Sequence, residues 1–293
     1  MGVIIFLFWL AVALAVAAAL AWSFRKAAAT LTRGEVSRAL RDAPLTAAFG
    51  MLVILVYAII AILAPAIAPF PERMVVGSQF MPWSGDHWLG TDALGRDMFS
   101  RMIYGTRNTV GIAFATTALA FLIGSILGLL AATVGGWLDQ GLSRLVDVLM
   151  AIPSLIFALL LLTIFGTSIL TLILVIAVID STRVFRLTRA VSEGVVVMDY
   201  IEAARLRGEG LGYLITREIL PNVTAPLVAE FGLRFCFVFL SISALSFLGL
   251  GIQPPTADWG SMVRENATLI TFGDVTPLLP AGAIALLTVA VNF

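Results

Sequence analysis

Seven residues in one polar segment have types and spacing that suit docking against a partner protein. They are Glu202, Ala203, Ala204, Gly208, Ile219, Leu220 and Pro221. Helix-favouring runs lie on either side of three closely spaced glycines, and a proline should end the second run. We therefore expect a helix, a turn and a second helix between about residues 199 and 221. Short helices that present small residues such as Ala203 and Ala204 can lie deep in a groove of another protein. The alternative is an ordinary solvated loop.

Two charged residues, Glu230 and Arg234, lie four positions apart within a long apolar run. This spacing places both side chains on one face of a helix. A lone charge costs about 2.5 to 3.5 kcal/mol to insert at the centre of a membrane helix, so we expect the two groups to neutralise one another. Contact with a transported solute is the alternative, because charges within a membrane also mark solute pathways. Asp180 and the arginines that follow it are expected to anchor their helix at the membrane interface.

A third set of residues forms a turn-like element ahead of the next apolar run. Its members are Gly90, Thr91, Asp92, Gly95, Arg96 and Asp97. We expect Thr91 or Asp92 to cap a following helix. Gly95 should allow close packing, and Arg96 should pair with Asp97. The favoured role is a structural turn, and the alternative role is docking of another protein.

Catalytic and nucleotide-binding patterns are absent from the sequence. A P-loop needs a lysine after a glycine-rich stretch, and the only lysine, Lys26, has no such glycines before it. The only histidine, His87, and the only cysteine, Cys236, lie in regions that several apolar runs separate, so they cannot form a metal site together. We therefore expect neither an enzyme nor a protein with a bound cofactor.

The composition places the chain in a membrane. Hydrophobic residues make up 60% of the sequence and charged residues only 12%, with a mean hydropathy of +1.03. Soluble proteins carry about twice that share of charged residues. Basic and acidic residues number 18 each, so no overall field would attract nucleic acid. The sequence therefore predicts an all-α, polytopic membrane protein surrounded by lipid bilayer.

Seven apolar runs are long enough to cross roughly 30 Å of hydrocarbon as helices. They are residues 3–22, 45–67, 109–134, 146–165, 169–185, 227–248 and 275–293. The fourth and fifth share one long apolar stretch. We divide it at Gly166, Thr167 and Ser168, because these residues favour a turn.

The basic residues predict the orientation, because Lys and Arg are enriched in cytoplasmic loops. Two basic regions should lie inside, one after the first apolar run and one within residues 183–217. This places the N-terminus and the segments 70–107 and 249–274 outside, and the C-terminus in the cytoplasm. The first run could instead be a cleaved signal peptide, but no positive charge precedes it, and Arg25 and Lys26 follow it. We therefore expect a retained helix.

The segment at residues 199–221 resembles the cytoplasmic coupling loop of binding-protein-dependent ABC importer permeases. Four further segments match the peptide/nickel branch of that family in the same order along the chain. They are residues 88–97, 147–154, 245–251 and 253–260. The chain is thus similar to the C-type dipeptide and oligopeptide permeases. The resemblance implies a type I importer transmembrane domain with six core helices, to which the first helix would be an addition.

The resemblance also implies a domain organisation and a set of partners. We expect an N-terminal helix with a basic segment at residues 1–44, a first core helix with an outer loop at 45–107, and the permease core at 108–293. The partners would be a homologous second permease, two ABC ATPase subunits and an extracytoplasmic solute-binding protein. Together they would import peptides or related small solutes through the inner membrane. Nickel or an opine-type solute is the alternative cargo, and an ion-coupled secondary transporter or a membrane scaffold is the alternative class.

Overall fold

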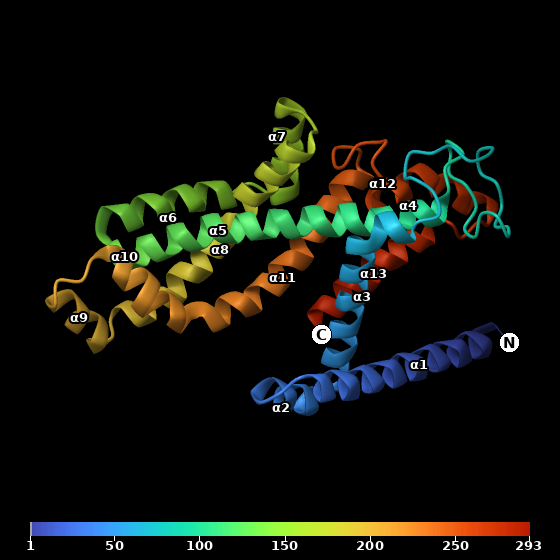
Figure 1. The fold of residues 1–293 in the computed structure, drawn as a ribbon. Coiled ribbons are helices and arrows are strands. Elements are labelled where there is room, and N and C mark those ends of the chain that lie inside the picture. The colour runs from blue at the N-terminus through green and yellow to red at the C-terminus, as the bar shows by residue number, and fades with distance from the viewer. Residues whose placement is uncertain (1) are drawn as a thin grey trace.

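The computed structural model describes the backbone of residues 2–293 and the side chains of residues 12–293. The all-α prediction is confirmed, and the described residues contain no extended strand (Figure 1). Besides the π-helical turns η1 and η2 and the 3-10 helix η3, residues 2–293 contain thirteen α-helices. In chain order the elements are α1 (Gly2–Leu31), α2 (Glu35–Asp42), α3 (Leu45–Ile67), α4 (Met98–Gly105), η1 (Thr106–Val110), α5 (Gly111–Val134), α6 (Gly136–Met150), α7 (Ser154–Phe165), α8 (Ile169–Val196), α9 (Asp199–Leu206), α10 (Leu211–Tyr213), η2 (Leu214–Ile219), α11 (Leu220–Phe247), α12 (Trp259–Asn266), η3 (Ala267–Phe272) and α13 (Leu278–Asn292).

Fewer helices than the seven predicted have the length and composition of a membrane span. Among the described residues, four do, and the bent pair of α6 and α7 makes a fifth if it is counted as one span. The four are Val12–Leu31, Leu45–Ile67, Met98–Val134 and Leu211–Phe247. The other two predicted spans fall in α8 and α13. α8 carries several charges in its second half, and α13, with 15 residues, extends only about 22 Å.

The predicted fourth span, residues 146–165, is not one straight helix. α6 ends at Met150, α7 begins at Ser154, and the two helices are bent by 87° relative to each other. Pro153 accounts for the break, because proline lacks a backbone N–H and disfavours helical conformation in the residue before it. α6 therefore runs alongside α5, whereas α7 turns away from it (Figure 1).

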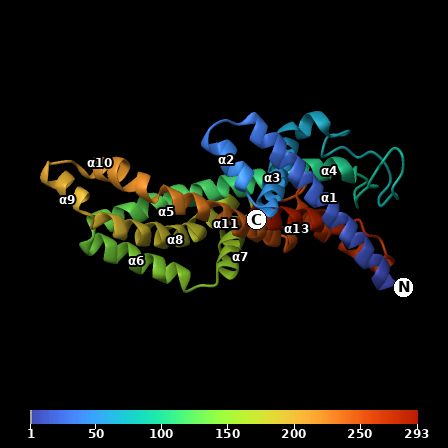
Figure 2. The same cartoon turned by 90° about the horizontal axis from the view of Figure 1, so that it is seen from below.

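Helices α5 and α8 pack together along most of their length (Figure 2). Gly124 and Gly128 of α5 lie on the contact face. A β-carbon on Gly124 would lie 2.6 Å from the carbonyl oxygen of Ser181, and one on Gly128 would lie 2.8 Å from Cβ of Thr188. Small residues four positions apart let two membrane helices approach closely. The glycine pair therefore sets the distance between these two helices.

Two polar regions lie at opposite ends of the molecule. α9 and α10 form one end, and the loop of residues 68–97 with α12 forms the other (Figures 1 and 2). The main apolar core lies near α12 and includes Trp259, Phe239 and Ile242, all fully or nearly fully buried. Trp259 Nε1 donates a hydrogen bond to the carbonyl oxygen of Met102, so α12 is fixed against α4.

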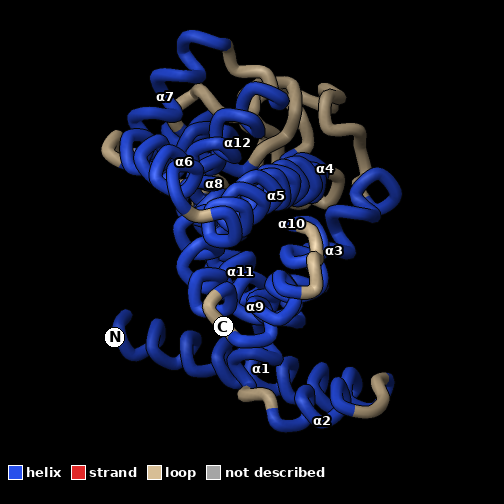
Figure 3. Tube along the Cα trace, turned by 90° about the vertical axis from the view of Figure 1, so that its left-hand side faces the viewer, coloured by secondary structure: helices blue, strands red, loops and turns tan. Residues whose placement is uncertain are grey.

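Helix α1 lies to one side of this bundle (Figure 3). It packs against α3 and against the short helix α2, and α3 packs in turn against α13. The N-terminal helix is therefore an attachment to the core, made through α3.

Candidate functional site

The segment of residues 199–221 contains the helix and turn that its sequence predicts. α9 ends at Leu206, and Gly208 has a φ of 83°, a left-handed conformation that favours glycine. The second half differs from the expectation, because Pro221 does not end a helix. Helical structure continues from Leu211 through α11 to Phe247. The π-helical turn η2 lies directly before α11, and its wider turn relieves the clash of the proline ring with the preceding carbonyl groups.

One side of this segment is buried against the membrane helices. Ala204 and Ile219 are fully buried in an apolar cluster that includes Leu129 of α5. Ala204 therefore packs within the segment, and the expectation that it presents itself to a partner is wrong. Arg205 donates a hydrogen bond of 3.2 Å to the carbonyl oxygen of Thr133, at the end of α5. These contacts hold α9 firmly on the helices behind it.

The opposite side of α9 is apolar and exposed. Within α9 the exposed fraction is 42% for Tyr200 and 83% for Leu206, and Ala203 is also exposed. Val197, in the turn just before α9, is 78% exposed. We call these four residues the α9 face. Large apolar side chains gathered on a surface mark a contact with another protein or with the membrane. The remaining predicted residues of the segment are exposed or partly exposed: Glu202, Gly208, Leu220 and Pro221.

The outer motif forms a network of buried charges. Asp92 is fully buried, and its Oδ2 accepts a hydrogen bond of 2.7 Å from Arg96 Nε. The same oxygen lies 3.2 Å from Nε of Arg101, a residue that the sequence did not single out. Arg96 also donates a hydrogen bond of 3.2 Å to Glu265 of α12. The network therefore joins the loop before α4 to the segment that follows α11.

Individual roles within the outer motif differ from those expected. The cap of α4 is Asp97, rather than Thr91 or Asp92. Asp97 also lies 3.0 Å from Nδ1 of His87, and Arg96 pairs with Asp92 instead of Asp97. These corrections have one cause, because spacing along the chain shows which groups are near in sequence but not how the loop folds back.

The glycines of this motif shape a tight, inward-facing turn. Gly90 and Gly95 have φ values of 71° and 72°. A β-carbon on Gly95 would collide with the carbonyl oxygen of Gly77. Thr91 Oγ1 donates a hydrogen bond of 2.6 Å to the carbonyl oxygen of Ser78. Because the polar side chains of the motif point inward, they shape the loop and offer little surface to another protein.

A second buried acid, Asp258, begins α12 at the same end of the molecule. Its Oδ2 accepts a hydrogen bond of 2.8 Å from the backbone N–H of Ser261, and its Oδ1 accepts one of 2.8 Å from Thr109. Burial raises the pKa of the Asp258 carboxyl, although these hydrogen bonds act in the opposite direction. Asp258 thus fixes α12 to η1 as well as capping it.

Glu230 and Arg234 belong to a larger charge cluster between α8 and α11. Arg234 Nε lies 2.6 Å from Glu230 Oε1, and a terminal nitrogen of Arg234 lies 3.8 Å from Asp180 Oδ1. Arg183 donates a hydrogen bond of 3.4 Å to the same oxygen. Asp180 is only 4% exposed, so it joins two helices rather than anchoring one at the membrane interface as expected.

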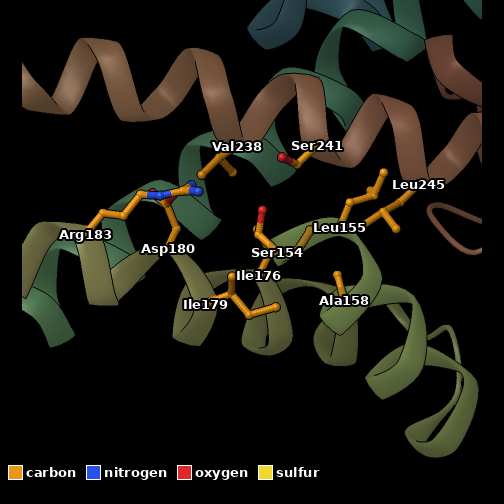
Figure 4. Close-up of a pocket in the computed structure, with 10 residues that line it drawn as sticks. All are labelled: Ser154, Leu155, Ala158, Ile176, Ile179, Asp180, Arg183, Val238, Ser241 and Leu245. Atoms are coloured by element: carbon orange, nitrogen blue, oxygen red, sulfur yellow. The ribbon is translucent and has the colours of Figure 1, made fainter. Parts of the chain in front are cut away.

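A small cavity adjoins this cluster between α7, α8 and α11 (Figure 4). Its volume of about 20 Å³ suits a single water molecule. The polar side chains that line it are Ser154, Asp180, Arg183 and Ser241. Asp180 Oδ2 is buried and has no hydrogen-bond partner among the described residues. We call the cavity and the charge cluster together the α8–α11 seam, a polar strip within otherwise apolar helices.

Comparison with known proteins gives one consistent family. Residues 120–293 match the family described as binding-protein-dependent transport system inner membrane component. A dipeptide transport system permease protein of Alkalihalophilus pseudofirmus is 33% identical over 83% of this chain and 80% of its own length. One of Haemophilus influenzae is 35% identical over 84% of this chain and 86% of its own length. A glutathione transport system permease protein of Pectobacterium atrosepticum is 34% identical over 71% of this chain and 69% of its own length.

Proposed function

Since the chain belongs to the family of binding-protein-dependent transport system inner membrane components, we propose that it forms part of the path for short peptides in an ATP-driven importer. Family membership makes it a permease subunit of an ABC transporter and not itself an enzyme. The names of its relatives concern dipeptides and glutathione, which favours a peptide cargo over nickel or an opine-type solute. An ion-coupled secondary transporter is not favoured, because these relatives are all permease proteins of transport systems.

The α9 face is the surface through which we propose that the chain is coupled to its ATPase. It is the exposed apolar surface of a short helix that lies at one end of the molecule (Figure 1). We propose that an ATPase subunit covers it, in the helix-in-groove manner that suits short helices. α9 is tied to α5 through Arg205 and through the cluster around Ala204. A displacement of α9 by the ATPase would therefore move the transmembrane helices.

The remaining partners follow from the family. An importer of this kind needs a homologous second permease, two ATPase subunits and an extracytoplasmic solute-binding protein. We place the coupling segment and the C-terminus in the cytoplasm, and the N-terminus on the outer side. The ion pair of Arg96 with Glu265 supports this topology, because it joins the two segments that are both expected outside.

The α8–α11 seam is the part of the chain that we assign to the solute path. Its charges lie within apolar runs of two helices, and ionisable residues inside membrane helices mark solute pathways as well as structural pairs. Asp180 Oδ2 has a free position for a hydrogen-bond donor, and Ser154 and Ser241 add further polar groups beside it. The cavity holds only about one water molecule, so the donors and acceptors of a peptide backbone would reach these groups only after α7, α8 and α11 move apart.

A transport assay on the assembled importer tests the proposal. The chain would be co-expressed with its partners, purified and placed in proteoliposomes, and ATP-dependent uptake of a labelled dipeptide would be measured. Ala203→Trp places a large side chain at the centre of the α9 face without disturbing the buried side of the helix. We expect this variant to insert normally into the membrane. The amount of ATPase that co-purifies with it should fall at least tenfold, and the rate of uptake should fall to the same extent.

The matched control is Ala39→Trp, the same substitution at an exposed position of α2. It should keep both the ATPase and the uptake. Normal ATPase recovery and uptake with Ala203→Trp would refute the docking assignment. Absence of ATP-dependent uptake of any short peptide by the unaltered assembly would refute the assigned cargo.

A further inference from the structure

The groove between α1 and α2 gathers positive charge at the polar end of an apolar helix. It has a volume of about 290 Å³. The side chains that line it are Trp22, Arg25, Lys26, Ala29, Thr30 and Arg41. Half of these are cations, and they come from both helices. The acidic residues of α2, Glu35 and Asp42, do not line it.

The groove has a defined shape, because several contacts hold α2 against α1. Gly34 makes the turn between the helices with a φ of 69°. Ser37 Oγ donates a hydrogen bond of 2.8 Å to the carbonyl oxygen of Ala29. Arg25 donates one of 3.0 Å to the carbonyl oxygen of Ala43, just after α2 ends. The cations therefore converge because the local fold brings them together.

The cations of the groove are left without counter-charges. Lys26 Nζ lies 4.1 Å from the centroid of the Trp22 ring, a cation–π contact that positions the ammonium group. Within residues 12–293, no ion pair involves Arg25, Lys26 or Arg41. Three convergent cations without an acid favour an anionic ligand that offers several acceptor oxygens.

Apolar side chains next to the groove limit what the ligand can be. Leu31 is 85% exposed and Val36 is 57% exposed, on either side of the turn at Gly34, and Trp22 is 46% exposed at the groove itself. A free inorganic anion would match the cations but would leave these side chains in water. A ligand that combines a phosphate with hydrocarbon chains satisfies both parts of the surface.

We propose that the groove binds the headgroup of an anionic phospholipid. The phosphodiester oxygens would accept hydrogen bonds from Lys26, Arg41 and the nitrogens of Arg25 that the Ala43 carbonyl does not use. The acyl chains would lie along the apolar surface of α1. The bound lipid would hold α1 and α2 in place beside α3, the long helix against which α1 packs.

Native mass spectrometry on the full chain with its co-purified partners tests this site. The complex in detergent would be titrated with phosphatidylglycerol, and the dissociation constant of the bound lipid would be measured. Lys26→Gln with Arg41→Gln removes two cations and leaves the Arg25 contact intact. Each basic residue beside an anionic lipid contributes roughly a fivefold factor, so the double variant should raise the dissociation constant about 25-fold.

A charge-matched control is available in the same segment. Arg33→Gln with Arg38→Gln removes two cations that do not line the groove, and it should change the dissociation constant less than about twofold. The conservative exchange Lys26→Arg with Arg41→Lys should retain binding, which shows that a loss in the Gln variant reflects charge and not misfolding. Equal losses in the two Gln variants would overturn the proposal. So would equal binding of phosphatidylcholine with the same acyl chains, or displacement of the lipid by inorganic phosphate, which would identify a free-anion site.

Discussion

Arg234 serves two carboxylates at once in the apolar interior, one from its own helix and one from α8. Its side chain is 11% exposed, that of Glu230 is 21% exposed and that of Asp180 is 6% exposed. Removing one member of such a cluster leaves opposite charges uncompensated in a medium that solvates them poorly. The energetic role of Arg234 is therefore larger than its single ion pair with Glu230 suggests.

We expect Arg234→Met to destabilise the subunit by about 3 kcal/mol or more, because it leaves two carboxylates with one remaining cation, Arg183. Thermal unfolding of the purified subunit in detergent measures the effect. Arg217→Met, at an exposed position, is the control and should leave the unfolding midpoint unchanged. Glu230→Gln combined with Arg234→Gln should recover part of the loss, because Asp180 then keeps Arg183. An Arg234→Met subunit as stable as the control would show that the cluster is not what holds α8 and α11 together.

Residue types and spacing locate most of the charged groups that matter, but they do not identify the partners. Asp92 and Arg96 stand out in the sequence, whereas Arg101 and Glu265 complete their network from other elements. Asp180 likewise pairs across to α11. Such partners depend on how helices cross, and a single sequence carries no direct signal for that.

At the scale of elements, the long apolar helices are the feature that the sequence predicts best, and the breaks and bends within helices are the feature that it predicts least well. The predicted span 45–67 coincides with α3. Pro153 and Pro221 both interrupt helix-favouring runs of the sequence. The helices are bent by 87° at Pro153, whereas helical structure continues through Pro221. The difference lies in the preceding turn, which is π-helical before Pro221. Ala203 and Ala204 are likewise indistinguishable in the sequence, because only the packing of the segment decides which of the two faces outward.

The contact between α5 and α8 gives a prediction for a single element pair. Gly124→Ala should destabilise the subunit by about 1 to 3 kcal/mol, because the new β-carbon would lie 2.6 Å from the Ser181 carbonyl oxygen and would push the helices apart. Gly111→Ala is the matched control in the same helix, since nothing lies within 4 Å of the position of its new β-carbon. There the gain in helix propensity should stabilise by about 0.5 to 1 kcal/mol.

Thermal unfolding of both alanine variants measures this difference. Opposite shifts of the two midpoints are expected. A stabilising shift in Gly124→Ala would show that α5 and α8 adjust to the extra methyl group, and that the glycine pair does not set their separation.

At the scale of the whole molecule, the polar ends define how the chain sits in the membrane. The proposed coupling segment, residues 199–221, lies at one end, and the loops joined by the Arg96–Glu265 pair lie at the other (Figure 1). α1 precedes this core and places the basic turn at Gly34 next to α3. Since we propose that the segment of residues 199–221 lies in the cytoplasm, we expect the positive turn on the same side, because basic residues are retained there.

Cysteine labelling in intact cells tests this arrangement. The single native cysteine, Cys236, is buried, and the substitution Cys236→Ser removes any background labelling of its thiol. Single cysteines are then placed at the exposed positions Thr268, Thr216 and Ala39. A membrane-impermeant maleimide should label Thr268→Cys from outside, whereas Thr216→Cys and Ala39→Cys should react only after the membrane is opened. Labelling of Ala39→Cys in intact cells would place the α1–α2 turn outside and reverse the orientation of α1. Labelling of Thr216→Cys in intact cells would remove the α9 face from the reach of any cytoplasmic ATPase.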